Sequence, residues 1–357
     1  MSIALPVLAP RAAARPPAAP LASAARLIDS HGRAIRDLRL SITDRCNFRC
    51  VYCMEPDARF MPETELLSVE EMIRLAGVCV SLGVHKIRLT GGEPTVHPRL
   101  TEIIAGVAAL GDIDLAITTN GAQADEERLH AWKAAGLRRI TISIDGVDPA
   151  RFAAITRSRT PPSRVIHAAA AAVRAGFQST KLNAVVVRGY NDDQVVPLAG
   201  LARDLGLEMR FIEFMPLDAA RAWDRTRLVP AAEILDQISA VFPLAGRGRD
   251  EPSSTSEAYA FADGAPGRIG VIAPVTNPFC GACSRLRITA DGKVRPCLFS
   301  KDEWDIRPIL RQGGEMLGDD HRIARFLVDA TWTKQAGHGI SAADFTPPPR
   351  SMHAIGG

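Results

Sequence analysis

The chain has 357 residues, 46% of them hydrophobic, which is enough for one large or two smaller domains. Its formal net charge of +3 is too small to indicate nucleic-acid binding, and aromatic residues, at 5%, are too sparse for a base-stacking platform. The sequence contains no apolar run of the roughly 18 residues that a membrane span needs and no signal peptide with a compact apolar core.

Seven cysteines form two groups of three, Cys46, Cys50 and Cys53, and Cys280, Cys283 and Cys297, with Cys79 alone. This distribution suits two metal clusters better than disulfides. Clusters held by thiolates need a reducing compartment, so the sequence predicts a cytoplasmic protein. Cys79 lies between two valines of a helical segment, and we expect it to be a small buried hydrophobic residue.

Residues 1–28 form a leader that consists largely of Ala, Pro and Arg. Pro16, Pro17 and Pro20 interrupt any helix and no hydrophobic period is sustained, so we expect a disordered leader. Because the leader contains arginines and no acidic residue precedes Asp29, an organelle transit peptide is the alternative.

The first cysteine group directly follows an alternating apolar segment, 37–43, that predicts a strand. The spacing Cys46-x3-Cys50-x2-Cys53 places three thiolates on one short loop. Three thiolates can hold three irons of a [4Fe–4S] cluster and leave one iron open for another ligand, whereas ferredoxins use four cysteines. The alternatives are chance clustering and a zinc site, which usually has four protein ligands.

From about residue 36 to 215, short strand-like runs alternate with helical segments. The expected strands are 37–43, 85–90, 113–118, 139–144, 181–187 and 209–214. The first expected helix begins at Ser68, where Glu71 completes a capping box, and others lie near 98–109, 125–135, 163–175 and 193–205. Six such units with short connections predict a parallel sheet that binds its ligand at the carboxyl ends of the strands.

Polar motifs follow these strands on one predicted rim. They are Thr90-Gly91-Gly92-Glu93-Pro94, Thr118-Thr119-Asn120-Gly121, Ser143-Ile144-Asp145-Gly146, Lys181 with Asn183, and Glu213-Phe214-Met215-Pro216. Two glycines let a backbone approach a ligand closely, and a proline fixes the turn. One such ending is unremarkable and Asn-Gly turns are common, but five endings on one rim indicate a built site.

The second cysteine group has the spacing Cys280-x2-Cys283-x13-Cys297 and follows a helical pattern at 231–241 and a polar loop at 246–256. Segments 286–289 and 293–295 flank Asp291-Gly292, which predicts a β-hairpin that returns Cys297 toward the first pair. A zinc ribbon that lacks one ligand is the alternative, but basic residues among the ligands favour a cluster that faces a substrate.

The chain ends in Gly356-Gly357, after the prolines at 347–349. From the sequence alone a floppy tail is the simpler interpretation. Two glycines could also thread a channel that is too narrow for a side chain.

The first cysteine loop, with Tyr52 before its third cysteine, resembles that of the radical S-adenosylmethionine (SAM) enzymes, and the Gly-Gly-Glu-Pro turn about 40 residues later matches their SAM amino-group motif. The second cysteine group, the Ser-Arg-Leu-Arg after Cys283, the Phe-Met-Pro at 214–216 and the terminal Gly-Gly together resemble the GTP 3′,8-cyclase family. This resemblance covers roughly residues 29–357. The family often has Cys-Met-Pro where this chain has Glu55 inserted before the proline, which leaves the ligands intact.

The resemblance implies an α/β fold, an open partial (β/α)6 barrel with a C-terminal auxiliary-cluster domain. The expected division is a leader at 1–28, the barrel at 29–245, the auxiliary-cluster domain at 246–340 and a tail at 341–357. Cys46, Cys50 and Cys53 would hold the [4Fe–4S] cluster that binds SAM, and Cys280, Cys283 and Cys297 an auxiliary [4Fe–4S] cluster that faces guanine.

Further residues match positions that bind the two small molecules in the family. Those that match SAM positions are Tyr52, Gly92, Ser143 and Met215; those that match GTP positions are Arg39, Arg88, Thr119, Lys181, Arg285, Leu286 and Arg287. Arginine and lysine supply charge-assisted hydrogen bonds to a triphosphate. Arg285 and Arg287 are also expected to act in catalysis by stabilising the late reduced product, and Gly356 and Gly357 to enter the site and help position an arginine.

The implied reaction is that of a lyase. Reductive cleavage of SAM gives a 5′-deoxyadenosyl radical that abstracts the 3′ hydrogen of GTP. Ring closure between C3′ and C8 and a reduction then give (8S)-3′,8-cyclo-7,8-dihydroguanosine 5′-triphosphate, the first step of molybdenum cofactor biosynthesis. The cofactor supplies the difficult chemistry, and the protein positions and shields it.

The implied partners are GTP, an electron donor and the next pathway enzyme, cyclic pyranopterin monophosphate synthase, with no nucleic acid and no membrane, in a monomer or homodimer. One other interpretation is a peptide-modifying radical enzyme such as a sulfatase maturase, although those usually have more than three C-terminal cysteines. The other is a non-catalytic iron–sulfur or zinc scaffold; to bind nucleic acid it would need a basic stripe that the small net charge does not indicate.

Overall fold

The structure is a computed structural model that describes residues 15–20, 26–311, 316–342 and 344–356. Its centre is a parallel sheet that contains all six predicted strands. They are β1 (Asp37–Ser41), β2 (Lys86–Thr90), β3 (Asp114–Thr119), β4 (Arg139–Ser143), β5 (Lys181–Val186) and β6 (Glu208–Glu213). Each strand pairs in parallel with the next, as the short connections predict.

C-terminal strands extend this core at both edges. Beyond β1 lie β10 (Arg285–Ile288), which is parallel to it, and then the antiparallel β11 (Lys293–Arg295) and β12 (Trp304–Asp305). Beyond β6 lie the parallel β9 (Arg268–Ile272) and the antiparallel β8 (Glu257–Phe261) and β7 (Leu244–Gly248). The order is β12-β11-β10-β1-β2-β3-β4-β5-β6-β9-β8-β7. The predicted partial barrel with an added C-terminal part is confirmed, and both edges of its core are paired.

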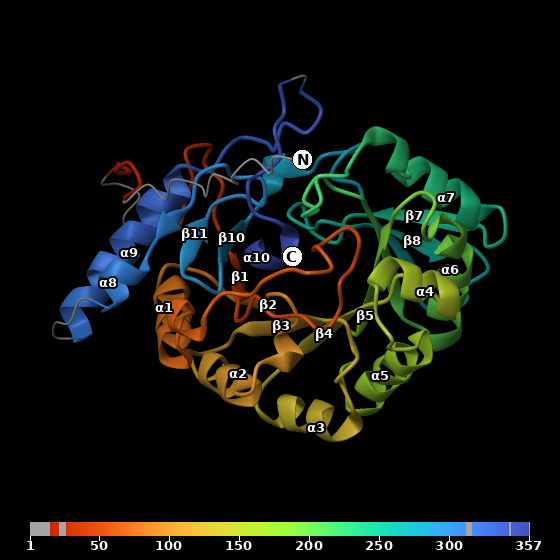
Figure 1. Ribbon diagram of the computed structural model, residues 1–357, viewed down its shortest axis with the longest axis horizontal. Coiled ribbons are helices and arrows are strands. Elements are labelled where there is room, and N and C mark those ends of the chain that lie inside the picture. The colour runs from red at the N-terminus through yellow and green to blue at the C-terminus, as the bar shows by residue number, and fades with distance from the viewer. Residues whose placement is uncertain (1–14, 21–25, 312–315, 343, 357) are drawn as a thin grey trace, which may run out of the picture.

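Helices surround the sheet on its outer face (Figure 1). The first, α1 (Val69–Ser81), begins at the predicted capping box, in which the Ser68 hydroxyl and the Glu71 carboxylate each accept from the other residue's N–H. The other predicted helices are α2 (Leu100–Ala108), α3 (Glu126–Ala134), α5 (Pro162–Arg174), α6 (Val195–Leu205) and α7 (Ala231–Ser239). Four helices were not predicted: α4 (Pro149–Thr156), α8 (Arg307–Arg311), α9 (Met316–Trp332) and α10 (Met352–Ile355).

The predicted loop at 246–256 is wrong in its first part, because β7 continues to Gly248. Because β7 has no buried residue, its sequence lacks the apolar alternation that predicts a strand. Its pairing with β8 is also irregular between Gly246 and Gly248. The hairpin of β10 and β11 is confirmed, with Arg287 opposite Arg295.

A hydrophobic core fills the space between the sheet and its helices. Alternate strand residues such as Leu40 and Leu89 are fully buried in it, whereas Arg39 and Arg88, one position earlier, face the inside of the barrel. Cys79 is fully buried in the same core, as predicted.

Of the leader, the structure describes residues 15–20 and 26–28. The Ala19 N–H donates to the Asp329 carboxylate of α9 at 2.8 Å, and the Arg325 guanidinium donates to the Ala19 carbonyl at 2.6 Å. Residues 1–14 and 21–25 lie outside the described residues, so disorder or a transit peptide stays a prediction. Within the described part of the chain, no helix is both long and apolar enough to cross a membrane.

Gly91 lies where the turn after β2 meets the first cysteine loop, and we expect Gly91→Ala to destabilise the fold. Its φ is +143°, and a Cβ there would lie 2.2 Å from the Thr43 carbonyl oxygen. We expect the free energy of unfolding to fall by more than about 2 kcal/mol in denaturant titrations. Gly111→Ala is the matched control, because φ is +135° there but nothing lies within 4 Å of the Cβ position. Equal losses in both variants would contradict the importance of the Thr43 contact.

Candidate active site

A cavity of about 520 Å³, a size typical of small-molecule sites, runs through the inside of the barrel. All six cysteines of the two groups line it. The other predicted residues that line it are Arg39, Tyr52, Arg88, Gly92, Thr119, Ser143, Lys181, Met215, Arg285 and Arg287. Leu286 does not, because strand alternation turns its side chain into the hydrophobic core, where it is fully buried. Gly357 lies outside the described residues.

Hydrogen bonds to neighbouring segments fix the first cysteine loop. The Arg49 and Val51 N–H groups donate to carbonyls at the end of α4, at 3.0 and 2.9 Å. Burial raises the pKa of Cys46 to about 11, and the Glu93 carboxylate adds to this shift. Burial also raises the pKa of Cys50 well above its ordinary value. These thiols stay protonated at neutral pH unless a cation stabilises their thiolates, as iron does.

The Gly-Gly-Glu turn after β2 attaches this loop to the sheet. The Gly92 N–H donates to the Thr43 carbonyl and the Glu93 N–H to the Arg45 carbonyl, both at 2.8 Å. A Cβ on Gly92 would lie 2.3 Å from the Arg45 carbonyl oxygen. The glycine is therefore needed for the close approach of two backbone segments, whereas the sequence suggested only the approach of a ligand.

Glu93 is buried, and its carboxylate accepts four hydrogen bonds. The donors are the Thr95 N–H (3.0 Å) and hydroxyl (2.6 Å), the Thr119 hydroxyl (2.6 Å) and the Asn120 N–H (2.6 Å). Burial raises the pKa of Glu93, although these donors oppose the shift. Because the Thr119 hydroxyl also accepts from the Gly121 N–H at 3.0 Å, it has one lone pair left for a ligand.

Tyr52 and Asp145 form a second link across the rim. The Tyr52 hydroxyl donates to one Asp145 oxygen at 2.7 Å, and the Val185 N–H donates to the other at 2.9 Å. Burial raises the pKa of Asp145 to about 6, although both donors oppose it. This pair joins the first cysteine loop to β4 and β5, where Ser143 lines the cavity.

The second cysteine group has basic neighbours. The Cys280 carbonyl accepts from the Arg33 guanidinium at 2.8 Å. Burial alone would raise the pKa of Cys283, but Arg285 and Lys334 outweigh it and lower the pKa to about 6. Lys334 also donates to the Arg285 carbonyl at 2.8 Å and to the carbonyl that precedes Cys297, so the hairpin brings Cys297 to the same cavity.

Both groups suit a [4Fe–4S] cluster with one open iron. Each brings three thiols to the cavity, and the seventh cysteine, Cys79, lies away from both in the core. In the described parts of the chain, no three His, Cys, Asp or Glu side chains are arranged to bind one metal ion. Each thiolate of a cluster binds a different iron, so three thiols that line one cavity can hold a cluster without converging on a single point.

Three arginines lie side by side inside the barrel: Arg287 on β10 is opposite Arg39 on β1, which is opposite Arg88 on β2. Burial lowers the pKa of Arg39 to about 10, with a contribution from Arg285, and that of Arg88 to about 9, with a contribution from Arg39. Burial also lowers the pKa of Arg287 well below its ordinary value. No acidic side chain of residues 15–20, 26–311, 316–342 or 344–356 forms an ion pair with these three. Cations that are buried, as Arg287 is, or half-buried, as Arg39 and Arg88 are, destabilise the free protein when they lack an acidic partner, and an anionic ligand would compensate them.

Sequence analysis missed four cations of the cavity, Lys86, Arg139, Arg210 and Lys334. Strand alternation could have found Lys86, which precedes Arg88 by two positions and therefore faces the same side. Arg210 and Lys181 both pair with Glu208, the latter at 2.9 Å. Burial would raise the pKa of Glu208, but these two cations lower it to about 2, so they remain paired at neutral pH.

The end of the chain enters the barrel, and α10 lies in the middle of the ring of elements in Figure 1. Gly356 has a φ of +85°, and a Cβ there would lie 1.8 Å from the Ser41 hydroxyl oxygen. The Ser41 hydroxyl donates to the Ile355 carbonyl at 3.2 Å, and the Arg287 guanidinium donates to the Gly356 carbonyl. Residues 351–356 thus have a fixed place rather than forming a floppy tail.

Comparisons with known proteins agree with this arrangement. A family model described as "Radical SAM superfamily" matches residues 40–202, and one described as "Molybdenum Cofactor Synthesis C" matches residues 207–340. The chain is 44% identical over 338 residues to a protein of Rhodopirellula baltica named GTP 3′,8-cyclase, covering 93% of this chain and 92% of that protein. It is 43% identical over 334 residues to a Streptomyces coelicolor protein of the same name, covering 93% and 96%.

The solved structure of Streptococcus suis SuiB bound to its precursor peptide SuiA is also similar, with a TM-score of 0.60 and 13% identity, covering 88% of this chain and 69% of that one. At this identity the similarity concerns the fold alone.

Glu93→Gln tests whether one carboxylate holds the rim together. Three of the four donors meet at Oε1 and the Asn120 N–H meets Oε2, so glutamine, which has a single acceptor oxygen, would turn an NH2 group toward at least one donor. We expect the free energy of unfolding of the cluster-free protein to fall by about 2–4 kcal/mol, and less iron to bind on reconstitution. Glu102→Gln is the control, because Glu102 forms only an exposed pair with Arg99 and should change stability little. Unchanged stability and iron content in Glu93→Gln would refute this role.

Proposed function

Because this chain belongs to the GTP 3′,8-cyclase family of radical SAM enzymes, we propose that the cavity inside its barrel binds SAM at the first cysteine group and GTP between the two groups. The reaction joins C3′ and C8 of GTP and is the first step of molybdenum cofactor biosynthesis. The protein is accordingly a lyase that uses SAM and two [4Fe–4S] clusters.

The row of Arg39, Arg88 and Arg287 is the observation that supports this assignment most directly. Arg287 is buried and Arg39 and Arg88 are half-buried; the three guanidinium groups have no acidic partner in the described chain and lie in register on neighbouring strands. A triphosphate carries several negative charges, and guanidinium groups form paired, charge-assisted hydrogen bonds with phosphate oxygens. GTP would therefore supply the counter-charge that the free protein lacks.

The cysteine groups would hold the clusters as their positions suggest: Cys46, Cys50 and Cys53 the SAM-binding one, and Cys280, Cys283 and Cys297 the auxiliary one. When bound, the first cluster and SAM supply the 5′-deoxyadenosyl radical that removes the 3′ hydrogen of GTP. Tyr52, Gly92, Ser143 and Met215 line the cavity and are the proposed SAM contacts.

The chain's own charges favour this orientation of the two small molecules. Glu93 and Asp145 lie near the first cysteine group, where their negative charge favours the SAM sulfonium. Arg285 and Lys334 lie near the second group, where their positive charge favours an anionic nucleotide. Arg285 and Arg287 are thus placed for substrate binding and for stabilising the late reduced product. Thr119, Lys181 and the backbone of Leu286 remain proposed GTP contacts.

The tail has a proposed part in this site as well. The Gly356 carbonyl accepts one N–H of Arg287, which orients the remaining donors of that guanidinium. Gly357 is proposed to continue into the site.

Several further assignments rest on the family and on general chemistry. An electron donor must supply the electron for SAM cleavage, and we propose cyclic pyranopterin monophosphate synthase as the enzyme that takes the product. A reducing compartment such as the cytoplasm would protect the thiolate clusters. A monomer or homodimer, a barrel at 29–245 and an auxiliary-cluster domain at 246–340 also remain proposals.

Anaerobic turnover tests the function directly. Reconstituted protein is incubated with SAM, a strong reductant and either GTP or ATP, and the products are followed by mass spectrometry. With GTP we expect release of 5′-deoxyadenosine and of an isomer of GTP, and with ATP no cyclised nucleotide. Deletion of Gly356 and Gly357 should abolish the nucleotide product while the iron content stays the same. If deoxyadenosine forms without a nucleotide product, the substrate assignment fails; if an iron-replete protein forms neither, the enzymatic assignment fails.

Arg39→Gln should change nucleotide binding and stability in opposite directions. Loss of a charge-assisted contact should weaken GTP binding about 10- to 100-fold in equilibrium dialysis. Loss of an uncompensated buried cation should raise the melting temperature of the nucleotide-free protein. Arg138→Gln is the control, because Arg138 forms an exposed pair with Asp112 and should alter neither value appreciably. An unchanged GTP affinity in Arg39→Gln would contradict the proposed role.

A further inference from the structure

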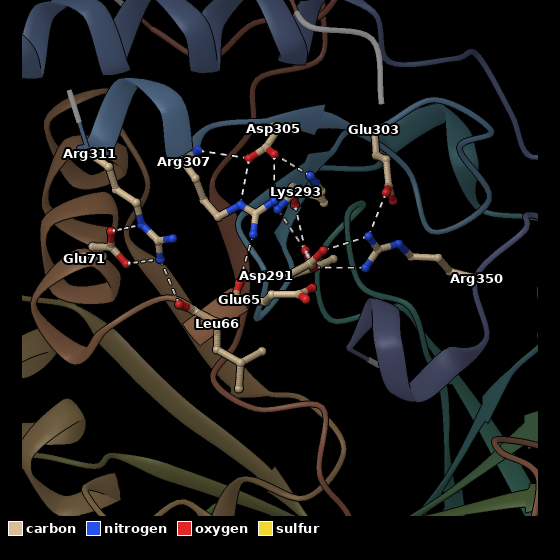
Figure 2. Close-up of polar contacts among 11 residues, drawn as sticks. Glu65, Leu66, Glu71, Asp291, Lys293, Glu303, Asp305, Arg307, Arg311 and Arg350 are labelled. Carbon is tan, nitrogen blue, oxygen red and sulfur yellow. Dashed lines mark hydrogen bonds and ion pairs between the residues drawn. The ribbon is translucent and has the colours of Figure 1, made fainter. Parts of the chain in front are cut away.

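Arg350 lies between the prolines at 347–349 and α10 and is held by two acidic residues. Its guanidinium forms two parallel hydrogen bonds with the Asp291 carboxylate, at 2.9 and 2.8 Å, and an ion pair with Glu303 at 2.8 Å. Figure 2 shows Asp291 at the tip of the Arg350 guanidinium and Glu303 above it. The three side chains are 17%, 6% and 2% exposed, so the contacts are largely shielded from water.

Both acids belong to the C-terminal end of the sheet. Asp291 lies in the turn between β10 and β11, where it also accepts from the Thr289 hydroxyl at 2.6 Å. Glu303 directly precedes β12 and also pairs with the fully buried Arg295 at 2.7 Å. These two anions and two cations balance one another, and Arg350 is the one member of the four that comes from the tail.

The segment after Arg350 follows a closely fitted path to the active site. The Met352 N–H donates to the Leu217 carbonyl at 3.0 Å, and Ile355 is fully buried. A shift of this segment by one residue would place Ile355 where Gly356 lies. That position cannot accept a side chain, because even a Cβ there would come 1.8 Å from the Ser41 hydroxyl oxygen. The site therefore requires the tail in one register.

The same hairpin holds the tail at two points. Asp291, in the turn, holds Arg350 before α10, and Arg287, on β10, holds the Gly356 carbonyl after it. Only a short segment separates Arg287 from Asp291 on the hairpin, and only a short segment separates Arg350 from Gly356 on the tail. Fixing Arg350 against Asp291 therefore determines where Gly356 lies relative to Arg287.

We propose that Arg350 is a positioning residue: its pairing with Asp291 and Glu303 sets the register of the C-terminal segment and so holds the Gly356 carbonyl against Arg287. This inference rests on the proposed function, in which Arg287 binds the substrate. Arg350 itself does not line the cavity and acts through the tail alone.

Hydrogen exchange of the protein without nucleotide tests the anchor. Residues 352 and 354–356 have hydrogen-bonded amides, and we expect Arg350→Gln to accelerate their exchange by about tenfold or more, since charge-assisted bonds of this kind are each worth about a decade in an equilibrium constant. Exchange in β2 to β5 should stay the same. Arg350→Lys should recover part of the protection, because a lysine can still pair with one acid.

Arg307→Gln is the matched control. Arg307 also pairs with an aspartate at this end of the sheet, Asp305 at 2.8 Å, and donates to the Glu65 carbonyl at 3.0 Å (Figure 2), but it forms no hydrogen bond or ion pair with the described residues of the tail. We expect it to leave exchange at 352–356 unchanged. If Arg307→Gln accelerates the tail as much as Arg350→Gln does, the effect is a general loss of stability and the proposal is overturned.

Asp291→Asn provides a second variant in case Arg350→Gln fails to fold, and it should release the tail in the same way. Both changes remove the Arg350–Asp291 pair, and Arg350→Gln also removes the Glu303 pair, so the double variant should exchange about as fast as Arg350→Gln rather than showing the product of the two effects. Unchanged exchange in Asp291→Asn and in any folded Arg350→Gln would refute the anchor.

Turnover then connects the anchor with the reaction. In Arg350→Gln we expect unchanged iron content and less cyclised product for each 5′-deoxyadenosine released, because the tail leaves Arg287. Undiminished product per deoxyadenosine, despite a released tail, would overturn the link to the site. If the unaltered protein forms no product, the proposed function fails, while the exchange result still decides whether Arg350 holds the tail.

Discussion

The parallel pairing of β10 with β1 is the interaction on which the rest of the site depends. It sets Arg287 beside Arg39, although the two strands are far apart in the chain. It also fixes the loop after β1, with the first cysteine group, relative to the hairpin that returns Cys297 to the cavity. Without it, β1 would be an open edge of the core, and no strand pairing would hold the two cysteine groups at a defined separation. The second half of the chain therefore completes the barrel of the first half.

The arginines inside the protein are of two kinds, and they differ in compensation as well as in depth, since Arg295 is fully buried and Arg39 and Arg88 are half-buried. Arg295 is fully buried, but it pairs with Glu303 at 2.7 Å and donates to the Ser300 carbonyl at 2.6 Å. Arg39 and Arg88 have no such acid in the described chain, and burial lowers the pKa of each. A compensated ion pair is part of the fold, whereas an uncompensated cation in a cavity indicates a ligand of opposite charge. In the described chain, the lack of an acidic partner therefore distinguishes the arginines of the site from Arg295.

What the sequence predicted and what it missed follow from how local each signal is. The six core strands alternate apolar and polar residues, and the Ser68 capping box and the cysteine spacings are local patterns, so all of these were accessible. β7 is exposed and glycine-containing, and the partners of Glu93 and Arg350 come from other parts of the chain, so neither the strand nor the contacts left a local pattern. At Leu286 strand alternation turns the side chain into the core and leaves the backbone for the proposed GTP contact, a distinction that the family position alone did not make.

The acids and the cations of the rim have different tasks. Glu93 and Glu213, after β2 and at the end of β6, accept from backbone N–H groups of neighbouring loops, including those of Asn120 at 2.6 Å and Val275 at 2.8 Å, and Asp145, after β4, accepts from the Val185 N–H of β5 at 2.9 Å. Irregular loops contain N–H groups that no strand partner satisfies, and one buried carboxylate can accept several of them at once. The acids of the rim thus maintain the loop framework, and because they are engaged there, they do not neutralise the arginines inside the barrel. The same arrangement that makes the loops rigid therefore keeps the cations available for an anionic substrate.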